Sequence, residues 1–211
     1  MLEVTDEVLL ELGRLVQGAL TDALNALAQQ DLVLADQVVR GDVAINRLRY
    51  AVEEQITASL PGSETGEATW MVAALYVISE LERMGDHAEG IAKVTLMLGP
   101  KPSLALPAVI GEMGKLTISM VDRTLSALAK RDVKAARALC REDDDIDSLY
   151  DRAYQELLTT MVSDHRHITH ATYMIWVTHN LERIADRATN ICERVVYLAT
   201  GHVEELNVSK Y

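Results

Sequence analysis

Two six-residue segments, one hundred positions apart, are near copies of each other: Leu81-Glu82-Arg83-Met84-Gly85-Asp86 and Leu181-Glu182-Arg183-Ile184-Ala185-Asp186. In each segment one acid precedes another by four residues, so both carboxylates project from the same face of a helix. Apolar residues at helical spacing surround the first segment, which places this face within an apolar stripe. Paired carboxylates in apolar surroundings are costly unless cations neutralise them, and this pattern is the first indication of function.

The repeat extends well beyond these two segments. Residues 31–48 recur 101 positions later, and residues 81–91 recur 100 positions later. The matched pairs in the first stretch are Asp31/Asp132, Ala35/Ala136, Arg40/Arg141, Asp42/Asp143, Ile45/Ile146 and Leu48/Leu149. Unrelated helices can share spaced leucines by chance, but they share the acids between those leucines less readily. The sequence therefore predicts a tandem duplication.

Helical periodicity and chain breaks divide each copy into three helices. The predicted helices cover residues 8–28, 31–58, 67–98, 108–130, 132–162 and 167–200. Gly99-Pro100-Lys101-Pro102-Ser103 interrupts any helix near the middle of the chain. The predicted fold is all-α, with two tandem three-helix bundles made of residues 1–100 and 101–211.

Composition supports this architecture and excludes several classes of function. The 211 residues are 49% hydrophobic and only 4% aromatic, without phenylalanine, which suits helix packing better than a β-sandwich. A net charge of -12 argues against nucleic-acid binding. No apolar run approaches the ~18 residues that span a bilayer, and no export signal is visible, so we expect a cytoplasmic protein without membrane insertion. Cys140 and Cys192 are expected to be reduced, buried thiols, with a disulfide as the alternative.

Acids on the neighbouring helices add to the two carboxylate pairs. Asp42 lies on the apolar stripe of the second helix, and Asp143 and Asp147 lie on that of the fifth. Short connections make the second and third helices of each repeat antiparallel neighbours, so these acids can face the pairs at Glu82 and Glu182. Clustered carboxylates without cysteine or histidine favour magnesium, manganese, calcium or iron over zinc.

Two other interpretations of these acids remain open. Arg83 and Arg183 could neutralise them in salt bridges, which would make the protein a metal-free helical adaptor. A carboxylate-bridged redox enzyme is the third interpretation, but di-iron bundles use Glu-x-x-His, and none of the six histidines has a glutamate three residues before it. The sequence also has no glycine-rich phosphate loop and no GxSxG motif, so we predict that the protein is not an enzyme.

The segments 80–88 and 180–191, together with Asp143-Asp144-Asp145-Ile146-Asp147, resemble the doubled signature of the PhoU family of phosphate-transport regulators. The resemblance covers nearly the whole chain. It implies tandem three-helix bundles that hold multinuclear metal clusters through E/D-x-x-x-D pairs. It also implies negative control of phosphate uptake and of the phosphate-starvation response. The implied partners are the ATPase subunit of the phosphate ABC transporter and the phosphate-sensing histidine kinase.

The same resemblance assigns the metal ligands, with iron, manganese or magnesium as the expected ions. The implied ligands are Asp42, Glu82 and Asp86 in the first repeat, and Asp143, Asp147, Glu182 and Asp186 in the second. The chain departs from the family pattern at Asn46, which stands where the second repeat has Asp147, so the first site is expected to bind cations more weakly. Ala185 replaces the usual glycine of the signature without removing a ligand. The architecture also admits a homodimer.

Overall fold

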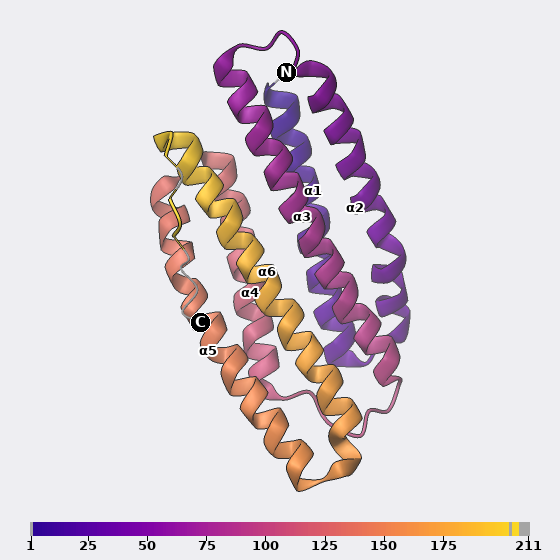
Figure 1. Ribbon diagram of the computed structural model, residues 1–211. Helices are drawn as coiled ribbons and strands as arrows, with labels where there is room; N and C mark the ends of the chain where they lie inside the picture. The colour runs from indigo at the N-terminus through magenta and orange to yellow at the C-terminus, as the bar shows by residue number, and fades with distance from the viewer. Residues whose placement is uncertain (1, 203, 207–211) are drawn as a thin grey trace.

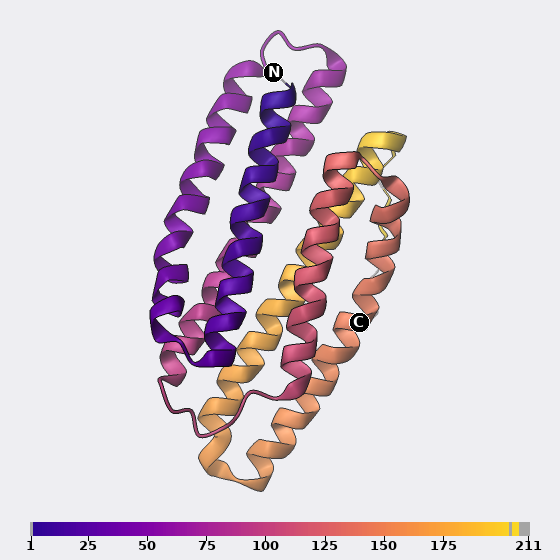
Figure 2. The same ribbon diagram turned by 180° about the vertical axis from the view of Figure 1, so that it is seen from behind.

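The computed structural model describes residues 2–202 and 204–206, and this part of the chain forms six α-helices and one turn of 3-10 helix. The elements are α1 (Leu2–Gln29), α2 (Leu32–Ser59), α3 (Thr65–Leu98), α4 (Ala108–Lys130), α5 (Val133–Ser163), η1 (His165–His167) and α6 (Ile168–Thr200). Helices α3 and α6 lie side by side in the middle of Figure 1, with α2 and α5 on the outer flanks. Figure 2 shows α1 and α4 side by side on the opposite face. The predicted all-α fold of two tandem three-helix bundles is confirmed.

The helix ends follow local capping chemistry. The Asp31 carboxylate accepts hydrogen bonds from the backbone N–H groups of Val33 and Leu34, both at 3.0 Å, and so begins α2. Asp132, its counterpart in the second repeat, accepts from the N–H of Ala135 at 3.0 Å and begins α5. Such caps satisfy N–H groups that have no partner within the helix. The largest difference from the predicted boundaries is at α1, which begins at Leu2 rather than at residue 8.

All six helices contribute to one continuous hydrophobic core. Leu12, Leu20, Leu81, Ile91 and Leu181 are among its fully buried side chains. The two bundles are therefore packed against each other rather than separated by solvent. Within the described residues, no helix is both long enough and apolar enough to cross a membrane.

The contact between α1 and α4 repeats the duplication in three dimensions. A Cβ atom built on Gly13 would lie 2.4 Å from Leu125 Cδ2, and one built on Gly114 would lie 3.0 Å from Leu24 Cδ1. Gly13 and Gly114 are 101 positions apart, as are Leu24 and Leu125. Each repeat thus supplies a glycine that accommodates a leucine of the other, and an approximate two-fold axis relates the two contacts.

This packing predicts opposite effects for two glycine substitutions on α1. Gly13→Ala should destabilise the protein by about 1–3 kcal/mol, because the new methyl group overlaps Leu125 and forces it to move. Gly18→Ala should stabilise the protein by up to about 1 kcal/mol, because Gly18 has open space around its Cα and alanine favours the helix. Urea denaturation of both variants measures the difference, and equal stabilities would contradict the glycine–leucine contact.

Polar side chains join the repeats between α3 and α6. The Glu80 carboxylate, only 6% exposed as a residue, accepts a hydrogen bond from Asn190 Nδ2 at 3.1 Å. Its Oε2 also lies 3.3 Å from Nη1 of Arg187. The counterpart of Glu80 is Asn180, whose Oδ1 lies 2.9 Å from His87 Nδ1. These contacts make α3 and α6 antiparallel, and they bring the two copies of the repeated segment to the same level along the bundle.

Candidate functional site

The first carboxylate cluster lies between α2 and α3. Asp42 comes from α2, and Glu82 and Asp86 come from α3. Asp42 and Glu82 are partly buried, whereas Asp86 is exposed. Burial, followed by the negative charges of Glu89, Asp86 and Glu82, raises the pKa of Asp42 above its ordinary value. The charges of Glu82 and Asp86 on α3 therefore act on the Asp42 carboxylate of α2.

Side chains of α2 already occupy part of this cluster. Arg49 Nη1 lies 2.9 Å from Glu82 Oε1, and Asn46 Nδ2 donates to Asp42 Oδ2 at 2.6 Å. Asp42 Oδ1 is buried and has no hydrogen-bond partner among the described atoms. Arg83, one of the two arginines expected to neutralise the acids, is exposed. The cation beside Glu82 is Arg49, which the sequence did not indicate.

The second cluster lies between α5 and α6. Asp143 is only 1% exposed, and Asp147 follows it by one turn on α5. Burial, followed by the charge of Asp186, raises the pKa of Glu182 to about 7, with a further contribution from Asp147. Burial also raises the pKa of Asp186, although Arg183 and Arg187 oppose this shift. The second cluster thus holds carboxylates that are hard to ionise together.

The cations of the second cluster come from α6 itself. Arg183 Nη1 donates to Asp186 Oδ2 at 3.0 Å, as the salt-bridge interpretation expected. Arg183 Nε and His179 Nδ1 lie 3.4 Å and 3.7 Å from Glu182 Oε2. That oxygen is buried and accepts no hydrogen bond among the described residues.

The two clusters differ most on the helix opposite the glutamate. At the offset of 101, Arg49 of α2 corresponds to Tyr150 of α5. Burial and the charge of Glu182 raise the pKa of Tyr150. A cleft of about 280 Å³ opens beside these two residues. We call it the α5–α6 cleft, and it is lined by Asp147, Tyr150, Asp151, Tyr154 and Glu182. The sequence contained the signal for this difference, since extending the repeat from Leu48 to residue 49 aligns an arginine with a tyrosine.

The seven predicted ligands have the right chemistry for a hard cation, but their side chains are not arranged to hold one. All are carboxylates, which magnesium, manganese and iron accept as ligands. Asp42 Oδ1 and Glu182 Oε2 are buried oxygens without hydrogen-bond donors, which is a suitable environment for a cation. However, no group of three or more histidine, cysteine, aspartate or glutamate side chains in the described residues is placed to hold a metal ion.

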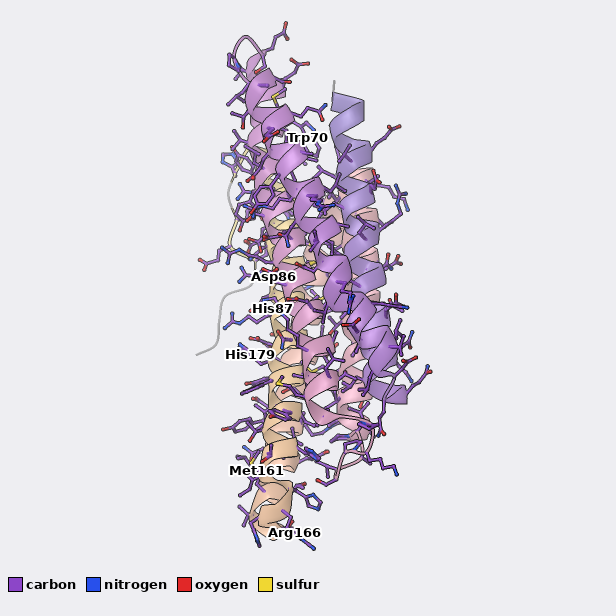
Figure 3. All side chains as sticks on the ribbon, turned by 90° about the vertical axis from the view of Figure 1, so that its right-hand side faces the viewer. Trp70, Asp86, His87, Met161, Arg166 and His179 are labelled. Atoms are coloured by element: carbon purple, nitrogen blue, oxygen red, sulfur yellow. The ribbon has the colours of Figure 1, made fainter. Side chains whose placement is uncertain are left out.

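The region between the clusters contains two histidines. Figure 3 labels Asp86, His87 and His179, which lie near the middle of the long axis of the molecule. Burial lowers the pKa of His87, and the nearby charges of Arg187 and His179 act in the same direction. The His87–Asn180 contact lies directly beside Asp86, so it links the neighbourhoods of the two clusters.

Two histidines near the start of α6 contact the linker between the repeats. His170 Nδ1 accepts a hydrogen bond from the backbone N–H of Ser103 at 2.8 Å, which fastens the linker between the repeats to the start of α6. His167 Nδ1 lies 3.3 Å from the hydroxyl of the same serine. Cys140 and Cys192 are buried free thiols, as expected.

The fold consists of two three-helix repeats, each with one carboxylate cluster. This arrangement defines a class of helical repeat proteins. The PhoU domain matches the chain twice, over residues 9–95 and over residues 110–195. The chain belongs to the PhoU family.

Relatives with similar sequences cover almost the whole chain. The Phosphate-specific transport system accessory protein PhoU homolog of Clostridium acetobutylicum is 32% identical over 209 residues, which is 98% of this chain and 95% of the relative. The homologue of the same description from Zymomonas mobilis is 36% identical and covers 90% of this chain and 81% of its own length.

Solved structures agree with this assignment. The crystal structure of the phosphate transport system regulatory protein PhoU from Streptococcus pneumoniae superposes with a TM-score of 0.91 at 33% identity, over 97% of each chain. PhoU from Pseudomonas aeruginosa gives the same TM-score at 32% identity, over 95% of this chain and 98% of the other. The resemblance seen in the sequence is confirmed.

Proposed function

We propose that this protein is a metal-binding negative regulator of phosphate uptake and of phosphate-starvation signalling. Family membership over both repeats carries the proposal, because relatives of nearly equal length are described as accessory or regulatory proteins of phosphate transport. The protein would act in the cytoplasm by contact with the ATPase subunit of the phosphate ABC transporter and with the phosphate-sensing histidine kinase. It would carry out no catalysis of its own.

The metal ions would be held by the two carboxylate clusters. Glu182, Asp186, Asp143 and Asp147 supply oxygen donors in the second repeat, and Asp42, Glu82 and Asp86 supply them in the first. A bound iron, manganese or magnesium ion would provide positive charge and would bridge carboxylates of neighbouring helices. Burial raises the pKa values of Glu182 and Asp186, and this supports the assignment because a bound cation would offset the cost of keeping buried carboxylates ionised.

A metal-free helical adaptor is the second candidate. The ion pair between Arg49 and Glu82 favours it, since an interhelical salt bridge replaces a cation at this point of the first repeat. The adaptor would use the same partners and the same regulatory role. The two candidates differ only in whether metal ions occupy the acids.

Deletion of the gene in its host tests the regulatory role. We expect phosphate-starvation genes to stay active in phosphate-rich medium, because the negative control is lost, and a reporter fused to such a gene measures this. A plasmid copy of the protein should restore repression. Normal repression in a deletion strain that has no second copy of the gene would contradict the proposal.

Elemental analysis of gently purified protein separates the two candidates. The variant with Glu182→Gln and Asp186→Asn should lose the metal of the second repeat if these acids are ligands. The matched control changes two exposed acids of the first repeat, Glu11→Gln and Glu54→Gln, and removes the same charge far from the second cluster. No metal in the unmodified protein would favour the adaptor, whereas unchanged metal content in the first variant would show that Glu182 and Asp186 are not ligands.

A further inference from the structure

The first repeat shows how this fold accommodates a guanidinium group. Arg49 extends from α2 toward α3, where its Nη1 lies 2.9 Å from Glu82 Oε1. Its Nη2 lies 3.4 Å from Glu53 Oε1, and its Cζ lies 5.2 Å from the ring centre of Tyr50. A glutamate from α3, a glutamate from α2 and a tyrosine therefore surround one arginine side chain.

The second repeat keeps the acceptor but not the arginine. Glu182 occupies the position of Glu82, whereas Tyr150 replaces Arg49 and Tyr154 replaces Glu53. In place of the arginine there is the α5–α6 cleft, with a volume of about 280 Å³. Arg183 of the same helix lies beside Glu182, with its Nε 3.4 Å from Oε2, but the arginine of the opposite helix is replaced by Tyr150.

We infer that the α5–α6 cleft receives an arginine side chain presented by a partner protein. The guanidinium would pair with the carboxylate of Glu182, as Arg49 pairs with Glu82, and would lie against the tyrosine rings. Asp147 and Asp151, which also line the cleft, add negative charge around it. In the first repeat Arg49 of the same chain occupies this position. In the second repeat the arginine would come from the partner.

The shape and lining of the cleft favour arginine over other cations. The rings of Tyr150 and Tyr154, which line the cleft, are stacked with their centres 6.4 Å apart and their planes inclined by 19°. A guanidinium group is planar, pairs with carboxylates through two parallel hydrogen bonds and stacks on aromatic rings. The ammonium group of lysine is not planar, so it cannot form two parallel hydrogen bonds and stack on a ring in the same way. At about 280 Å³ the cleft is large enough for a guanidinium group.

This inference rests on the proposed function in one respect, because a regulator that acts by contact needs a partner. Glu182 and Asp147 are also proposed metal ligands, so an arginine and a metal ion would compete for the cleft, and the test is made with a chelator present. The inference specifies the chemistry of the partner, namely a surface or loop with an exposed arginine. The strongly acidic charge of the chain, -12, would steer such a basic surface toward the protein.

Peptide binding to the full chain tests the inference. The probe is a fluorescein-labelled peptide of three arginines separated by glycine and serine, and a second peptide has lysine in place of each arginine. Fluorescence anisotropy at 0.15 M salt, with a chelator present, measures both affinities. We expect the arginine peptide to bind about tenfold more tightly than the lysine peptide, because only arginine can pair and stack at the same time.

Three variants with the same change in net charge locate the site. Tyr150→Arg should weaken the arginine peptide about tenfold or more, because the new side chain would occupy the cleft as Arg49 occupies the first repeat. Glu182→Gln should weaken it to a similar extent and keeps the test decisive if the first variant does not fold. Glu54→Gln alters an exposed acid on α2 and should leave the affinity unchanged.

The outcomes are distinct. Equal affinity for the two peptides, or an equal loss in Glu54→Gln, would reduce the binding to general electrostatics and overturn the inference. Binding of manganese without a chelator, with no binding of either peptide, would overturn it in favour of a metal site. A Tyr150→Arg protein that fully restores repression in the deletion strain would leave the regulatory role intact while removing the role of the cleft.

Discussion

Replacing Arg187 with methionine will destabilise the folded protein by about 3–5 kcal/mol, because it removes the cation from a buried carboxylate. The Glu80 side chain is 8% exposed and lies between α3 and α6, where water cannot readily replace the guanidinium. Asn190 would remain as its hydrogen-bond donor, but an amide does not neutralise the charge. A shift in the midpoint of urea denaturation, followed by circular dichroism, measures the loss.

A second substitution and an exposed control make this result specific. Changing Glu80→Leu together with Arg187→Met should recover most of the loss, because no charge is then left buried at the contact. Arg141→Met makes the same chemical change on an exposed part of α5 and should shift stability by no more than about 0.5 kcal/mol. A double variant that is less stable than Arg187→Met alone would show that the pair contributes more than the neutralisation of one charge.

The metal-free protein will lose stability as the pH rises from about 4.5 to 7, because Glu182 must release a proton in the folded state. Its pKa is about 7 in the fold against 4.5 for an ordinary glutamate, so between these values the folded state binds more protons than the unfolded state. The contribution of Glu182 to stability is therefore fully present below pH 4.5 and is lost as the pH rises to about 7. The shift corresponds to about 3 kcal/mol at 1.36 kcal/mol per pH unit.

Comparison with Glu182→Gln isolates the contribution of this one group. His87 has a lowered pKa and acts in the opposite direction below about 6.5, so the pH profile of the unmodified protein is a sum. The glutamine variant cannot ionise at position 182. It should be more stable than the unmodified protein at pH 8 and should lose this advantage at pH 4.5, with a chelator present in both. Parallel pH profiles of the two proteins would contradict the raised pKa.

The helices could be predicted because their signals are local. Apolar residues at steps of three and four define each helix, and Gly99, Pro100 and the acids Asp31 and Asp132 mark breaks and starts. The start of α1 was placed too late because Thr5 and Asp6 are residue types that cap helices and so indicate a start near Val8, whereas the helix begins at Leu2. The contact of Gly13 with Leu125 was also beyond prediction, because periodicity shows which face of a helix is buried but not which helix covers it.

Six of the seven candidate acids could be singled out because the duplication marks them twice, and Asp147, which aligns with Asn46, is the exception. Among the cations that pair with these acids, Arg49 could not be predicted. Arg49 could have extended toward solvent, toward Glu53 or toward Glu82, and only the packing of α2 on α3 decides among these. The α5–α6 cleft depends on the tyrosines of α5, which look like ordinary core aromatics when the second repeat is considered without the first.

The approximate two-fold relation between α3 and α6 has an evolutionary consequence. In a homodimer, a substitution at the symmetry axis occurs twice, so a new acid brings two like charges into the same contact. Here the two copies belong to one chain, and each substitution occurs once. Position 80 is therefore glutamate opposite Arg187 and Asn190, while position 180 is asparagine opposite His87 and Gly90. Because the two copies lie in one chain, the contact holds a single ion pair, which two identical subunits could form only by accepting both charges on both sides.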